Sequence, residues 1–141
     1  MEIVKLHPPV VHFAIAFPVF LLLTDIYYRI RKKTPDGLHG MLTYVSVFAV
    51  LGATISGIIA HEPIEERLHK IPVFESHELL GFFLSFFFLL IGVLRFLQGR
   101  TQSEKIRDIY SILLFIGVLL LFLQGRWGGS IVYDYLLKGG F

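Results

Sequence analysis

The chain has 141 residues, of which 55% are hydrophobic and 17% charged, and its formal net charge is +2. This length suits one domain. Because the chain has no cysteine, disulfides, iron–sulfur clusters and thiolate zinc sites are excluded, and a redox role would need a cofactor held by histidine. The charges fall in short clusters between long apolar runs. This pattern predicts an integral membrane protein that has the lipid bilayer as its partner and binds no nucleic acid.

Four apolar runs are each long enough to cross a bilayer, which takes about 20 residues in helical form. The turn residues Pro35-Asp36-Gly37 separate the first two runs, and Ile71-Pro72 interrupts the second connection. The predicted fold is an all-α, up-down-up-down four-helix membrane bundle that occupies residues 1–141 as a single domain. Its spans are expected at about 8–29, 38–61, 73–97 and 107–125.

The segment after the fourth run, residues 126–141, is too short and broken to span a membrane. Its aromatic residues Trp127, Tyr133 and Tyr135 suit the headgroup zone, because amphipathic rings prefer the membrane interface. We therefore expect a short interfacial C-terminal tail.

Basic residues predict the orientation of the bundle. Lys and Arg accumulate in short loops on the cytoplasmic side of a membrane. Both chain termini should therefore be periplasmic, with the protein in a bacterial inner (cytoplasmic) membrane. At the end of the third run, Arg95 is expected to extend outward to the interface. Eight of the 13 Lys and Arg residues lie around the first and third connections: Arg29, Arg31, Lys32, Lys33, Arg95, Arg100, Lys105 and Arg107.

The histidines concentrate at the predicted periplasmic end. His12, His61 and His77 should enter the membrane at similar depth, close to three different helix ends. A single histidine at a helix end is usually an ordinary interfacial polar residue, whereas three at matched depth favour a shared ligand. Five of the six histidines lie at this end (His7, His12, His61, His69 and His77), and His39 lies at the other.

A bis-histidine haem b is the first hypothesis for that ligand. Such a haem takes two imidazoles from different helices of a bundle. We predict His12 and His77 as the axial ligands, because their helices should lie diagonally across the core, with His61 as the alternative to either. Lys5, His7, Arg126 and Trp127 are candidate partners for the propionates. On the cytoplasmic side His39 lacks a second histidine, so at most one haem is expected.

Small residues accompany the predicted ligands. Ala16 follows His12 by four residues, and Gly81 follows His77 by four, so each shares a helix face with its histidine. Gly57 likewise precedes His61 by four residues. These positions suit a haem groove, and they suit close helix packing equally well.

A bare metal site is the second hypothesis, because imidazole and carboxylate ligands together suit zinc, copper or iron. Five glutamates accompany His61, His69 and His77 in the second connection, although a solvated loop is the simpler explanation of so many acidic residues. At the other end, Asp25 is expected to pair with Arg29 at i+4. The glutamates are Glu62, Glu65, Glu66, Glu75 and Glu78.

Together these features favour an electron-transfer subunit over a stand-alone enzyme, because no loop is large enough to enclose a substrate. The protein would carry electrons between the quinone pool, or a membrane dehydrogenase, and a periplasmic acceptor such as a c-type cytochrome. The alternative is a cofactor-free or metal-binding membrane subunit that anchors or assembles a larger complex. The sequence leaves a homo-oligomer open in both cases.

The opening residues His7-Pro8-Pro9-Val10-Val11-His12-Phe13 resemble the HPxxVHF signature of a family of small bacterial membrane proteins catalogued as a domain of unknown function. The resemblance extends over most of the chain, including Asp25, His77 and the glycine-rich tail. It implies the fold and topology given above and no settled activity.

Overall fold

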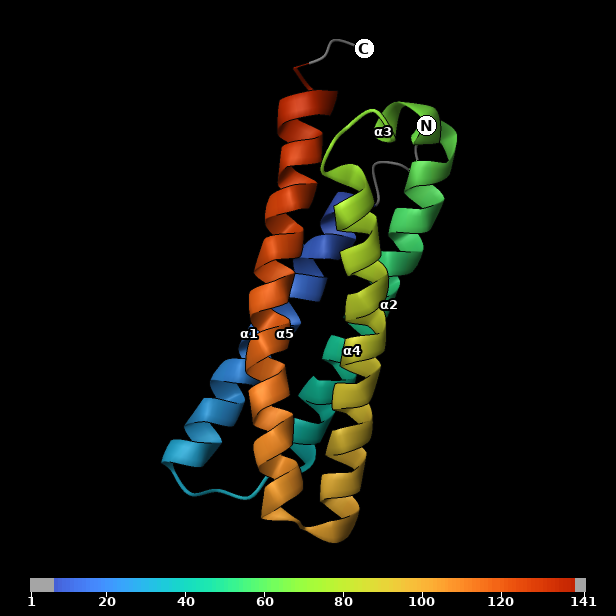
Figure 1. Ribbon diagram of the computed structural model, residues 1–141. Helices are drawn as coiled ribbons and strands as arrows, with labels where there is room; N and C mark the ends of the chain where they lie inside the picture. The colour runs from blue at the N-terminus through green and yellow to red at the C-terminus, as the bar shows by residue number, and fades with distance from the viewer. Residues whose placement is uncertain (1–6, 139–141) are drawn as a thin grey trace.

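The computed structural model of the chain describes residues 7–138. Four long helices run up and down beside one another (Figure 1): α1 (His7–Ile30), α2 (Gly37–His61), α4 (Phe74–Thr101) and α5 (Glu104–Ser130). A 3₁₀ turn, η2 (Glu62–Ile64), and the short α3 (Glu65–Leu68) connect α2 to α4. All four long helices are long and apolar enough to cross a membrane. The predicted all-α membrane bundle is confirmed.

The fourth helix extends beyond residue 125, where its span was expected to end. The first five residues of the predicted tail continue α5 to Ser130, and the π-helical η3 (Ile131–Leu136) follows directly. Glycine is a poor helix former, but here Gly125 lies against Ile15 and Gly128 against His77. Contacts that only glycine permits therefore hold this part of the chain in the bundle.

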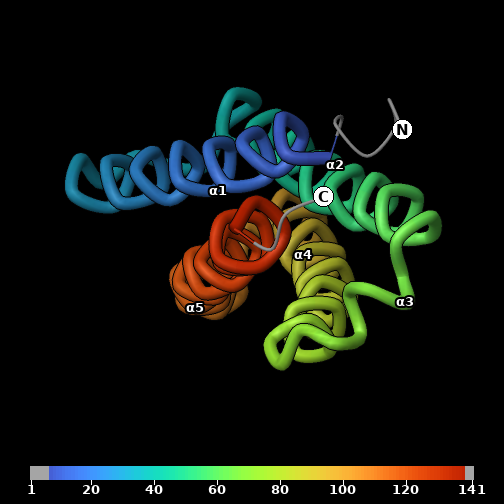
Figure 2. The backbone as a smooth tube through the Cα atoms, turned by 90° about the horizontal axis from the view of Figure 1, so that it is seen from above, coloured from blue at the N-terminus to red at the C-terminus, as the bar shows by residue number. Residues whose placement is uncertain are grey.

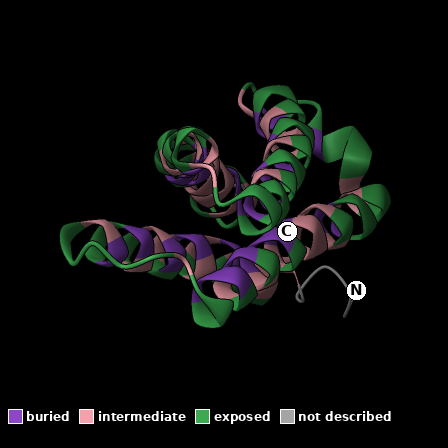
Figure 3. Ribbon diagram, turned by 90° about the horizontal axis from the view of Figure 1, so that it is seen from below, coloured by how far each residue is buried: buried purple, intermediate pink, exposed green. Residues whose placement is uncertain are grey.

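The core lies along the bundle axis. Helix α1 packs against α2 and α5, and α4 packs against the same two, so α1 and α4 are diagonal partners (Figure 2). Leu21, Leu84, Phe88 and Leu114 meet at the centre and are almost fully buried. Figure 3 shows buried residues facing inward and exposed ones outward. Many exposed side chains are large and apolar, such as Phe48 and Phe86, as expected of a surface in contact with lipid.

The two ends of the bundle differ in character (Figure 1). The first and the last described residues lie at the same end of the bundle, which we call the termini end. The opposite end, the basic end, carries the connections 31–36 and 102–103. Here Asp36 caps α2 by accepting a hydrogen bond from the His39 backbone N–H (3.1 Å), and Ser103 caps α5. The bonds from His39 N–H and from the Tyr28 hydroxyl lower the pKa of Asp36 below its ordinary value.

Close packing at the centre makes Gly117→Ala a destabilising change. A Cβ atom at Gly117 would lie 3.1 Å from the rings of Phe87 and Phe88, and overpacking of this kind costs about 1–3 kcal/mol. The matched control is Gly52→Ala, because a Cβ there meets nothing within 4 Å and alanine favours the helix by up to about 1 kcal/mol. Unfolding in mixed micelles titrated with dodecyl sulfate should separate the two variants, and equal stabilities would contradict this packing.

Candidate metal centre

A cavity of about 300 Å³ lies among the four long helices at the termini end. Its walls are mainly apolar side chains and glycine backbone, with a few polar groups that converge from different helices, as is usual for ligand sites. The cavity is lined by His7, Pro8, Val11, His12, Ala14, Ile15, Val50, Ala53, Thr54, Gly57, Ile58, His61, His77, Glu78, Gly81, Phe82, Leu84, Leu121, Gln124, Gly125, Gly128, Gly129, Val132 and Tyr133.

Three histidines from three helices meet at this cavity. His7 is the first residue of α1, His61 is the last of α2, and His77 lies in the first turn of α4. The up-down topology brings these three positions to the same end. Each imidazole offers one nitrogen within 4.8 Å of the other two, and the ring centroids of His7 and His77 lie 5.7 Å and 6.3 Å from that of His61. We call His7, His61 and His77 the histidine trio.

One member of the trio is held in place by a polar neighbour. Nδ1 of His7 lies 2.9 Å from Oγ of Ser56. The Ser56 hydroxyl is also within hydrogen-bond distance of the Ala53 carbonyl, at 3.0 Å. When the hydroxyl donates to that carbonyl it accepts from Nδ1–H of His7, and the lone pair of Nε2 is then left for a ligand. A hydrogen bond of this kind, from the non-coordinating nitrogen, usually orients metal-bound histidines.

Two buried polar atoms at the cavity have no hydrogen-bond partner among residues 7–138. One belongs to the trio: Nδ1 of His77, whose residue is 9% exposed. The other is Oε1 of the neighbouring Gln124. The amide nitrogen of Gln124 is satisfied, because it donates to the His77 carbonyl at 2.9 Å. Leaving a buried polar atom unpaired costs about 1–3 kcal/mol. A ligand in the cavity would explain both atoms.

Glycines make room for the polar side chains of the cavity. A Cβ at Gly57 would stand 3.1 Å from Cε1 of His7, and one at Gly81 would stand 3.1 Å from the amide nitrogen of Gln124. The two glycines singled out in the sequence thus line the cavity and contact functional side chains. Ala16, chosen on the same pattern, is exposed and lies outside the cavity lining.

Gly128→Ala should displace the His77 ring. A Cβ at Gly128 would lie 3.0 Å from Cε1 of His77, so the imidazole must shift and the trio loses its alignment. We expect metal affinity to fall by about 10-fold or more, in the range seen when the support of a metal ligand is disturbed. The neighbouring Gly129→Ala is the control, since a Cβ there meets nothing within 4 Å. Zinc titration calorimetry compares them, and an unchanged affinity in Gly128→Ala would contradict the predicted contact.

The other residues predicted for a haem or metal site do not belong to the trio. His12 lines the cavity but is exposed, and its Nδ1–H donates to the carbonyl of Pro8 at 2.6 Å. Arg126 is exposed and Trp127 half-buried, and neither lines the cavity. His69 is also exposed, 3.5 Å from Glu65. Of the five glutamates only Glu78 lines the cavity, and Lys5 lies outside the described residues.

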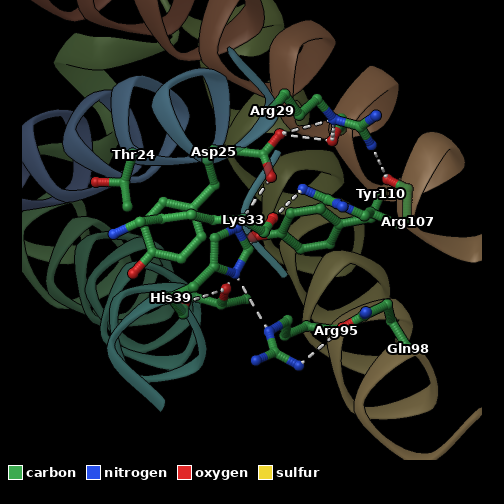
Figure 4. A network of polar contacts seen from close by, with 12 residues as sticks. Thr24, Asp25, Arg29, Lys33, His39, Arg95, Gln98, Arg107 and Tyr110 are labelled. Atoms are coloured by element: carbon green, nitrogen blue, oxygen red, sulfur yellow. Dashed lines mark hydrogen bonds and ion pairs between the residues drawn. The ribbon is translucent and has the colours of Figure 1, made fainter. Parts of the chain in front are cut away.

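The basic end holds a buried polar network that the sequence analysis missed (Figure 4). His39 is fully buried, and its Nε2 lies 2.9 Å from a carboxylate oxygen of Asp25. Arg95 donates through Nε to Nδ1 of His39 at 3.2 Å. The prediction that Arg95 extends outward was wrong, because it is 9% exposed and turned into the bundle. The expected Asp25–Arg29 pair is present at 3.7 Å.

Hydrogen-bond roles fix the charge state of this network. An arginine can only donate, so Nδ1 of His39 must accept and its Nε2–H must donate to Asp25. His39 is therefore neutral and links Asp25 on α1 to Arg95 on α4. Ser111 on α5 donates a further hydrogen bond to Asp25. The network ties all four long helices together at the basic end.

The model of one protein family, described as predicted membrane protein (DUF2231), matches residues 4–138 of this chain. No curated protein and no solved structure matches it.

Proposed function

This chain belongs to the predicted membrane protein family DUF2231, and we propose that it is a metal-binding membrane subunit that holds one divalent transition-metal ion in the histidine trio. The observation that carries the proposal is the convergence of three imidazole nitrogens, within 4.8 Å of one another. These nitrogens come from three different helices and meet at one cavity. Imidazole is a good ligand for zinc, copper and iron.

The surroundings of the trio suit an ion with one open coordination position. Three protein ligands and one exchangeable ligand form the usual tetrahedral site of reactive zinc centres. In such a site the ligand nitrogens stand about 3.4 Å apart, so the three rings would draw closer together on binding an ion. The unpaired Oε1 of Gln124 is an acceptor for a water or other ligand at the open position. Glu78, which also lines the cavity, is a second acceptor.

The basic residues support an orientation for this centre. Arg29, Arg95 and Arg107 belong to the basic end, which the positive-inside rule assigns to the cytoplasm. The histidine trio would then face the periplasm across a bacterial inner membrane. In that position the centre can serve periplasmic partners or ligands.

A bis-histidine haem b is the second candidate, and one observation favours it. His12 and His77 line the same cavity from the diagonal helices α1 and α4. Such a haem would support electron transfer from the quinone pool or a membrane dehydrogenase to a c-type cytochrome. The compactness of the trio favours the ion, because a macrocycle between two axial imidazoles leaves no room for a third beside them.

Metal analysis together with the visible spectrum of the purified full-length protein separates the two candidates. The ion proposal predicts about one zinc, copper or iron per chain and no haem absorption bands, in protein from haem-replete cells. A reduced α-band that disappears in His12→Ala would establish the haem instead. Protein that contains neither metal nor haem, and that takes up no zinc when titrated, would overturn both candidates and leave the cofactor-free anchor subunit.

A further inference from the structure

Arg95 is a buried cation without a direct counter-ion. No carboxylate lies within 4.0 Å of its guanidinium among residues 7–138. The His39 ring stands between Arg95 and the Asp25 carboxylate, and Asp36 meets Arg95 only through its backbone carbonyl. The three hydrogen-bond partners of Arg95 are all neutral: His39 Nδ1, Gln98 Oε1 and the carbonyl of Asp36. A buried charge is costly unless it is paired. An anion beside Arg95 would remove this cost.

A pocket next to Arg95 has room for such an anion. It has a volume of about 340 Å³, opens between α2 and α4 at the basic end, and is lined by both Arg95 and Arg100. Arg100 is exposed, and its guanidinium lies 5.4 Å from the centre of the Phe96 ring. Two guanidinium groups, one buried and one exposed, thus border the same opening.

Glycines on both helices keep the Arg95 guanidinium within reach of the pocket. A Cβ at Gly40 would lie 3.2 Å from Nη2, and one at Gly99 would lie 3.1 Å from Nη1. Both glycines line the pocket. A guanidinium has five N–H donors, and the three hydrogen bonds named above occupy one each on Nε, Nη1 and Nη2. One N–H on each terminal nitrogen is therefore left to donate.

We infer that this pocket binds a phosphate-bearing anion, either the headgroup of an anionic phospholipid or free phosphate. Two parallel N–H groups of one arginine match the oxygens of a phosphate, and Arg100 supplies a second positive charge. Basic pockets between helices on the cytoplasmic side of a membrane suit anionic lipid headgroups. Exposed apolar side chains beside the pocket, Met41 and Phe96, suit the acyl chains of such a lipid. This inference is independent of the histidine trio.

Thermal unfolding of the full chain in neutral detergent tests the inference. Phosphatidylglycerol should raise the unfolding temperature more than phosphatidylcholine at the same mole fraction, with inorganic phosphate alone as a third arm. Arg100→Gln should weaken the apparent affinity for phosphatidylglycerol by about 10-fold, the usual effect of losing one charge-assisted hydrogen bond. Because Arg100 is exposed, this variant leaves the buried network in place.

Arg31→Gln is the matched control, since Arg31 is exposed at the same end of the bundle and outside the pocket. It should retain the effect of phosphatidylglycerol. If inorganic phosphate reproduces the stabilisation and Arg100→Gln removes it, the anion is free phosphate, bound as inferred. Equal stabilisation by the two lipids with no effect of phosphate would overturn the inference, and so would equal losses in Arg31→Gln and Arg100→Gln.

Discussion

Asp25→Ala should lower the free energy of unfolding by about 3–5 kcal/mol, because it leaves one buried and one half-buried hydrogen-bond donor without an acceptor, at about 1–3 kcal/mol each. Asp25 is 1% exposed and accepts hydrogen bonds from His39 on α2 and Ser111 on α5. Without the carboxylate, Nε2–H of His39 would be buried with no acceptor. The Ser111 hydroxyl would lose its acceptor as well.

Asp108→Ala is the matched control for this prediction. Asp108 pairs with Arg29 at 2.8 Å, but its side chain is 61% exposed, so its loss should cost less than about 1 kcal/mol. Titration with dodecyl sulfate in mixed micelles measures both variants under the same conditions. A loss of less than 1 kcal/mol in Asp25→Ala would show that the network contributes little to the stability of the bundle.

Alanine variants of the histidine trio should lose more than about 100-fold in zinc affinity. Disturbing only the support of a metal ligand already costs about 10–100-fold, and each of these variants removes a ligand itself. Ser56→Ala should fall within that 10–100-fold range, because it removes the acceptor that orients His7. Calorimetric titration of the purified full-length protein with zinc measures all of these affinities.

His12→Ala and His69→Ala are the controls for the trio. Both histidines are exposed at the same end of the bundle, and neither belongs to the trio. Their variants should bind zinc as tightly as the parent protein, within about threefold. If His12→Ala loses as much affinity as His77→Ala, the site includes His12 and the proposed ligand set is wrong.

The bundle could be predicted from the sequence because the bilayer imposes a simple length requirement. Four uncharged runs of sufficient length admit few other folds. The charge pattern also led the sequence analysis to group His7, His61 and His77 at one end, where the structure places them. Depth along the membrane is therefore readable from the sequence of this chain.

Rotation about a helix axis is not readable in the same way. His7 and His12 are five residues apart, which places them about 140° apart around α1, so their side chains leave the helix in different directions although both line the cavity. In a soluble protein the apolar face of a helix would identify the inward side. Here the lipid-facing side is apolar too, and the apolar neighbours of His12 carry no information about its direction. The sequence analysis ranked His12 first, whereas the trio contains His7.

The network at the basic end was missed for a related reason. Arg95 ends an apolar run, a position where arginine often extends to the interface. Two of its three hydrogen-bond partners, His39 and the carbonyl of Asp36, lie more than 50 positions earlier in the chain. Sorting every ionisable residue by depth would have placed Asp25, His39 and Arg95 at one level, although it could not have shown that they touch.

X-ray absorption at the zinc edge, on protein loaded with one equivalent of zinc, tests the central claim most directly. The histidine trio predicts three imidazole ligands with Zn–N distances of about 2.0–2.1 Å, and one non-imidazole ligand, such as water, in the fourth position. The imidazole count should fall to two in His77→Ala and stay at three in His12→Ala. A parent spectrum with two or fewer imidazoles would contradict the proposed centre.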